Sequence, residues 1–227
     1  ATYNGQGDYI RALRIGGNEN DEVNGIHMDA SGNILMTGMF KGNVDFNPST
    51  FTAFLGSNGG DDGYVVKLSP SGTYVWARSF GGEDNDKGID ISADYLGNIL
   101  VTGFFKGYPD FYSGTPDSYA QATSEEDIFV LSLKPNGDFD RIDQISGVGS
   151  DAGSAIAHYE TTRYYIAGSF TQELDADPTA DVFALSSNGA DDYFLGSINI
   201  CPAVYSFFEA TACDSMLSPD GELVWTS

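Results

Sequence analysis

Short apolar runs typical of β-strands recur along the chain, separated by turn sequences. Residues 34–40 alternate large and small side chains, and residues 63–68 and 73–80 form two further runs; the three end at Lys-Gly, Ser-Pro-Ser-Gly and Gly-Gly. Alternation bounded by glycine, proline, serine and asparagine is typical of β-strands. With a short run at 25–29, the pattern predicts four strands per unit, and the variable stretch that follows residue 40 could add one over 51–55. No apolar run has helical spacing, so we expect an all-β fold.

The pattern repeats every 65 residues through three copies. Residues of one type keep the phase, as in Gly38, Gly103 and Gly168, and in Phe40, Phe105 and Phe170. Four antiparallel strands repeated at constant length are typical of a β-propeller blade. We therefore predict a propeller built from 65-residue four-stranded repeats, in preference to a string of small β-domains or a β-solenoid.

The repeat predicts one array over residues 1–227. Residues 1–17 would be the last strand of a preceding blade, and 213–227 part of a fourth blade. The three full blades would span 18–82, 83–147 and 148–212. Residues 215–225 match 66–76 at an offset 46 residues short of three repeats, so about 46 residues of the fourth copy are missing. Because propellers have roughly four to eight blades, we expect an incomplete ring: an excerpt of a larger propeller, or a chain that closes with another.

The net charge of the chain argues against some classes of function. The chain has 10 Lys and Arg against 33 Asp and Glu, a net charge of −23. Such a surface repels phosphate backbones and anionic headgroups, which argues against nucleic-acid binding and against basic-patch membrane binding. No apolar stretch is long enough for a membrane helix, so direct insertion is not expected. The chain shows no signal-peptide pattern at its start and is interpreted as a mature form or an excerpt.

Acidic residues are the only abundant group of candidate site residues. One set lies in loops that resemble Asp-Phe-Asn-Pro, and because Ca²⁺ prefers oxygen ligands, it is a candidate calcium site. The alternative is that these side chains cap turns through the backbone. The candidate calcium residues are Asp45, Asn47, Asp110, Asp175 and Asp177. Two further sets, one residue per copy, are predicted to fix turns: Asp21, Asp86 and Asp151, and Asp62, Asp127 and Asp192.

Other chemistry is sparse. His27 and His158 are not related by the repeat, and no catalytic triad, nucleophile elbow or zinc motif can be assembled around them. Acids that recur in every copy fit a structural role better than one unique active site. Cys201 and Cys213 lie twelve residues apart. They could form a disulfide in an exported protein, or they could be two buried thiols.

The motifs DASGNILMTGMF, VDFNP and GGDDGYVVKLSPSGTYVWARSFGG resemble the SBBP (seven-bladed β-propeller) repeat of bacteria. The second copy matches well and the third is degenerate. The resemblance implies a secreted or cell-surface protein, often one that travels through an outer-membrane export system.

The sequence thus favours a non-enzymatic extracellular module for adhesion, binding or scaffolding, with a protein or glycan at the cell surface as partner. One alternative is a secreted carbohydrate-active enzyme with a pocket lined by Glu160, Glu173 and Asp175. Another is a passenger bound to its export machinery.

Overall fold

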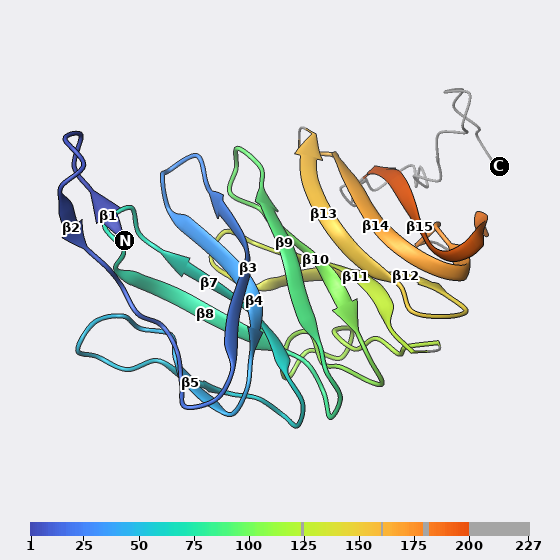
Figure 1. Cartoon of the computed structure of the whole chain (residues 1–227), viewed down its shortest axis with the longest axis horizontal. Coiled ribbons are helices and arrows are strands. Elements are labelled where there is room, and N and C mark those ends of the chain that lie inside the picture. The colour runs from blue at the N-terminus through green and yellow to red at the C-terminus, as the bar shows by residue number, and fades with distance from the viewer. Residues whose placement is uncertain (124, 160, 179–181, 200–227) are drawn as a thin grey trace, which may run out of the picture.

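The computed structural model describes residues 1–199, except 124, 160 and 179–181. The described residues form β-strands and turns and no helix, as Figure 1 shows, so the all-β prediction is confirmed. None of them belongs to a helix long and apolar enough to cross a membrane. Cys201, Cys213 and the predicted fourth copy lie outside the described residues, as does Glu160.

Antiparallel pairing organises the strands into three groups. The first is a sheet in the order β3 (Asp21–Met28), β4 (Ile34–Phe40), β7 (Asp62–Leu68), β8 (Tyr74–Phe80). The second runs β9 (Lys87–Ala93), β10 (Ile99–Phe105), β11 (Asp127–Leu133), β12 (Phe139–Gly147). The third comprises β13 (Ala152–Tyr159), β14 (Arg163–Asp175) and β15 (Ala184–Asn199), with β14 in the middle. We call these groups sheets 1, 2 and 3. A two-residue pairing between β12 and β14 links sheets 2 and 3.

Two small hairpins complete the described fold. β1 (Thr2–Tyr3) pairs with β2 (Tyr9–Arg11), and β5 (Asn43–Asp45) pairs with β6 (Phe54–Gly56). The strand expected over 51–55 is thus displaced to β6. The first strand of sheet 1 begins at Asp21, four residues before the predicted run, because it extends past a bulge to the end of β4.

The repeated glycine in the second strand of each sheet has a steric cause. The first strand of each sheet bulges opposite this glycine, so that one extra residue of β3, β9 or β13 is accommodated. A Cβ at Gly38 or Gly103 would overlap a backbone carbonyl oxygen of the neighbouring strand. Gly168 is similarly close to the carbonyl of Ala152. The glycine therefore permits the bulge in all three sheets.

The first strands of the three sheets lie side by side (Figure 1). Between β3 and β9, the Asn24 side chain donates to the carbonyl of Gly88 at 3.0 Å. Lys87 Nζ lies 2.7 Å from Glu22 Oε2 across the same junction. Between β9 and β13, the Ile156 nitrogen donates to Asp90 Oδ2 at 2.8 Å.

Apolar side chains fill the space between successive sheets. Leu35 and Val65 of sheet 1 are buried in one cluster with Val101, Phe105 and Phe129 of sheet 2. At the next junction, Leu100 and Val130 of sheet 2 share a cluster with residues of sheet 3 that include Ile156, Ile166 and Phe194. Because side chains alternate along a strand, sheet 2 supplies one set of residues to sheet 1 and the other set to sheet 3.

Candidate functional site: the repeated aspartates

The aspartates of the predicted calcium loops cap those loops. One carboxylate oxygen of each accepts a hydrogen bond from the backbone nitrogen two residues on and another from the residue eight places on. The second donor is a backbone nitrogen in the first and third loops and a serine hydroxyl in the middle loop. The distances to Asp45 are 3.0 Å from Asn47 and 2.8 Å from Ala53; to Asp110, 2.9 Å from Tyr112 and 2.7 Å from Ser118; and to Asp175, 3.2 Å from Asp177 and 2.9 Å from Phe183.

These contacts bear on the calcium prediction. The Asn47 side-chain oxygen accepts from the Ser49 nitrogen at 3.0 Å, so it too serves the turn. Among the residues that the structure describes, no group of three or more His, Cys, Asp or Glu side chains is placed to hold a metal ion. The loop geometry therefore matches the alternative reading, in which the side chains stabilise turns, and calcium binding stays a prediction.

The two other sets of aspartates also contact the backbone at equivalent positions. Asp62, Asp127 and Asp192 each accept from the nitrogen four residues earlier, at 3.1, 2.7 and 2.8 Å. Asp21 and Asp86 each accept from the second glycine of the preceding turn, at 2.7 and 2.8 Å. In sheet 3 the Asp151 carboxylate accepts from the Thr171 nitrogen at 3.3 Å. The contacts support the interpretation that these residues fix turns.

The structure brings the two sets together between the sheets. The Asp86 nitrogen, just before β9 of sheet 2, donates to the carbonyl of Asp61, just before β7 of sheet 1, at 2.7 Å. The equivalent link at the next junction runs from the Asp151 nitrogen to the carbonyl of Glu126 at 2.8 Å, beside Asp127. Each junction thus holds a pair of aspartates, and their side chains are at most 1% exposed.

Burial governs the ionisation of these pairs. It raises the pKa of Asp62 to about 7 and that of Asp86 to about 7. The Asp62 charge raises the pKa of Asp86 further. At the second junction burial raises the pKa of Asp127, and it raises that of Asp151 to about 6, with the Asp127 charge acting in the same direction. A carboxylate that loses water without gaining a cation favours its protonated form.

Hydrogen bonding does not fully compensate this burial. Within the described structure, Asp62 Oδ1 and Asp151 Oδ2 are buried and have no hydrogen-bond partner. At the second junction the Gln144 side chain donates to Asp127 Oδ2 at 3.0 Å. The residue of sheet 1 equivalent to Gln144 is Ser79. The 65-residue period revealed each set of aspartates but not their pairing. The signal that could have revealed it is the spacing of 24 residues from Asp62 to Asp86 and from Asp127 to Asp151.

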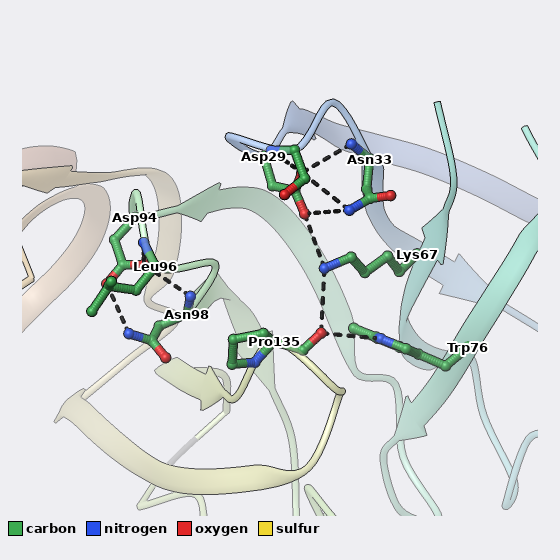
Figure 2. A network of polar contacts seen from close by, with 9 residues as sticks. Asp29, Asn33, Lys67, Trp76, Asp94, Leu96, Asn98 and Pro135 are labelled. Carbon is green, nitrogen blue, oxygen red and sulfur yellow. Dashed lines mark hydrogen bonds and ion pairs between the residues drawn. The ribbon is translucent and has the colours of Figure 1, made fainter. Parts of the chain in front are cut away.

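A second buried polar network joins sheets 1 and 2 (Figure 2). Asp29 Oδ2 forms an ion pair with Lys67 Nζ at 2.9 Å, and Asp29 also accepts from the backbone and side chain of Asn33. Lys67 Nζ in addition donates to the carbonyl of Pro135, in the turn after β11, at 3.3 Å, and the Trp76 indole donates to the same carbonyl at 3.4 Å. Burial disfavours the Asp29 charge, but the hydrogen bonds from Asn33 and Lys67 outweigh it and lower its pKa to about 2.

Asp94 repeats the Asp29 turn in sheet 2. Its carboxylate accepts from the backbone nitrogens of Leu96 and Asn98 and from the Asn98 side chain, at 2.9, 2.9 and 2.8 Å (Figure 2). These contacts explain the Asp-x-x-Gly-Asn motif of the first two copies: the Asp and Asn close the turn, while Gly32 and Gly97 have positive φ angles of 78° and 87°. Sheet 3 has Tyr159 in place of the Asp.

Three of the remaining candidates, His158, Glu173 and Asp175, lie in the described part of the structure. Burial lowers the pKa of His158 to about 4, and its Nδ1 lies 3.2 Å from the Ser92 hydroxyl, within a contact between sheets 2 and 3. Glu173 is exposed on β14, whereas Asp175 caps its loop.

The buried Asp62 pair gives stability a characteristic pH dependence. The pKa of Asp62 is raised from 3.8 to about 7 in the folded state, so the folded protein keeps a proton that the unfolded chain loses. The contribution of this proton to the free energy of unfolding is therefore fully present below about pH 4 and is lost as pH rises through 7. We expect Asp62→Asn to raise the free energy of unfolding at pH 8 by about 2 kcal/mol, since one pKa unit corresponds to about 1.4 kcal/mol and the pair shares its protons. The variant should also flatten the fall in stability between pH 5 and 8, measured by urea unfolding.

Asp192→Asn is the matched control, because Asp192 makes the same backbone contact but is partly exposed. We expect it to leave the pH dependence unchanged. An Asp62→Asn variant with the wild-type slope between pH 5 and 8 would contradict the assignment.

The fold defines the class: an all-β protein of antiparallel sheets stacked side by side, with aspartates at equivalent places in successive sheets. No protein-family model matches the chain, and a search of curated proteins found no match. The resemblance to the SBBP repeat therefore rests on the sequence motifs alone.

Proposed function

We propose that the chain is part of a β-propeller whose blades are the sheets, and that it acts outside the bacterial cell as a non-enzymatic module for adhesion, binding or scaffolding. Its partners would be glycans or proteins of the cell surface. The motifs shared with the SBBP repeat support the proposed location, and export through an outer-membrane system is part of the same proposal.

Two regularities support the propeller. The strands β4 and β10 begin 65 residues apart, as do β7 and β11, and β8 and β12. The first strands of the three sheets lie next to one another, as the innermost strands of neighbouring blades do around a propeller axis.

The observation that carries the non-enzymatic role is the equivalence of the acids. Raised carboxylate pKa values occur at two successive junctions, at residues that are at most 1% exposed. A glycosidase needs two carboxylates about 5–10 Å apart that both reach the substrate. Aspartates closed off between sheets cannot reach one, so their regular recurrence favours a structural role.

Exposed aromatic rings support a binding role. Tyr108 and Tyr119 are 62% and 45% exposed, and their rings stack with centroids 5.6 Å apart. Flat, exposed rings of this kind suit stacking against sugar rings or apolar side chains. Because the net charge is −23, neutral glycans and basic proteins are favoured over acidic partners.

Native gels that contain neutral polysaccharides, run beside reducing-sugar assays on the same polysaccharides, test this function. We expect retarded migration with at least one polysaccharide and no release of reducing sugar. Replacing Tyr108 and Tyr119 with Ala should weaken retardation severalfold, whereas the control Tyr95→Ala, at a ring 71% exposed, should not. Sugar release that disappears in an acidic-residue variant would instead support the carbohydrate-active enzyme.

A further inference from the structure

Sheet 1 has an apolar face on the side away from sheet 2. We call this face, made by Val23, Ile26, Met36, Phe40 and Tyr64, the leading face. Phe40 and Tyr64 are buried against Val44 and Phe46, so the part open to solvent is Val23 and Ile26 with the half-buried Met36. An open groove there is lined by Val23, Met36, Phe40 and Tyr64 among others. Ile26 is 68% exposed and Val23 is 59% exposed, so β3 presents branched apolar side chains to solvent.

The other sheets show what covers this face elsewhere in the molecule. Ile91 and Ile156 stand at the positions equivalent to Ile26, and they are only 2% and 5% exposed. Val101, equivalent to the half-buried Met36, is completely buried. In each case the preceding sheet covers them, so the natural occupant of the leading face is a sheet of the same repeat.

Sheet 3 exposes the complementary surface at the other end. Leu35 and Val65 of sheet 1, and Leu100 and Val130 of sheet 2, pack against the following sheet and are at most 1% exposed. Their equivalents in sheet 3 are 38% and 76% exposed. We call the surface made by these two residues and two neighbours on the same side of β14 and β15 the trailing face: Tyr165, Leu195, Ala167 and Tyr193.

One pair of positions supports a match in size between the two faces. At the inner junctions, the ideal Cβ positions of Gly88 and Gly153 lie against the hydroxyls of Thr37 and Thr102, so a small residue of one sheet faces a β-branched residue of the other. The equivalent pair across the leading and trailing faces is Val23 and Ala167, in which the small and the β-branched residue have exchanged sides. Either arrangement lets the sheets approach closely.

We propose that the leading face binds the trailing face of a second copy of this chain, head to tail. This inference rests on the reading of the sheets as equivalent blades in the proposed function. Ile26 and Met36 then occupy the environment that Ile91 and Val101 have within the chain, against Leu195 and Tyr165 of the partner copy. Because the two surfaces differ, each copy keeps one of them free, and assembly continues until a ring closes or a filament forms.

Sedimentation velocity over a range of concentrations tests the proposal. We expect the weight-average mass to rise from 24.3 kDa towards multiples of that value. Ile26→Glu on the leading face and Leu195→Glu on the trailing face should each reduce association at least tenfold. Phe51→Glu is the matched control, since it adds the same charge at an apolar side chain that is 77% exposed in a loop.

A mixture of the two variants distinguishes head-to-tail docking from other association. The Ile26→Glu chain keeps an intact trailing face, and the Leu195→Glu chain keeps an intact leading face. The mixture should therefore form a dimer of one of each and stop there. A wild-type chain that stays monomeric at every concentration, or a mixture that fails to pair, overturns the proposal. Polysaccharide retardation by a monomeric chain would leave the proposed function standing, so the two can fail separately.

Discussion

Replacing Lys67 with Met is expected to lower the free energy of unfolding by about 3 kcal/mol. The side chains of Lys67 and Asp29 are 8% and 4% exposed, so the substitution leaves a carboxylate buried without its cation. It also removes the hydrogen bond to the carbonyl of Pro135, which ties sheet 1 to the turn after β11 of sheet 2 (Figure 2). Urea unfolding at pH 7 measures the change.

Lys87→Met is the control for this prediction. Lys87 and Glu22 also form an ion pair, at 2.7 Å, but their side chains are 28% and 49% exposed. Because solvent screens these charges, Lys87→Met should lower the free energy of unfolding by less than about 1 kcal/mol. Replacing Asp29 by Asn in the Lys67→Met chain should recover part of the lost stability, because the uncompensated charge is gone. Equal losses from Lys67→Met and Lys87→Met would refute the role of burial.

Gly103→Ala is expected to lower the free energy of unfolding by about 3 kcal/mol or more, because the new methyl group would overlap the carbonyl oxygen of Lys87. The backbone of β9 cannot move away without losing its pairing with β10 at the bulge. Thermal and urea unfolding both report the loss, and Gly38→Ala should reproduce it in sheet 1.

Gly189→Ala supplies the comparison. Gly189 lies in β15, and no heavy atom approaches within 4 Å of the position that its Cβ would take. Its substitution should change stability by no more than about 0.5 kcal/mol. If Gly103→Ala were equally mild, the bulge would not be the reason for the repeated glycine.

The local patterns of the sequence were sufficient for the strands and their turns. The predicted runs match β4, β7 and β8 nearly to their bounds, because turn residues close each run. The turn-fixing role predicted for Asp62 and Asp127 agrees with their contacts, since such a turn is formed by its own side chains and backbone. The displaced strand β6 shows the limit, because its position depends on pairing with β5 rather than on its own residues.

What the sequence by itself determined was therefore the all-β class, the 65-residue period and the residues that close each turn. Only the tertiary structure decided that Asp62 lies beside Asp86 and that Lys67 reaches Asp29 and Pro135. The physical reason is the distance along the chain over which each kind of interaction acts. Turn capping and strand alternation act within a few residues of the chain, whereas burial and ion pairing depend on which sheets pack together, and that is settled by the packing of apolar side chains far apart in sequence.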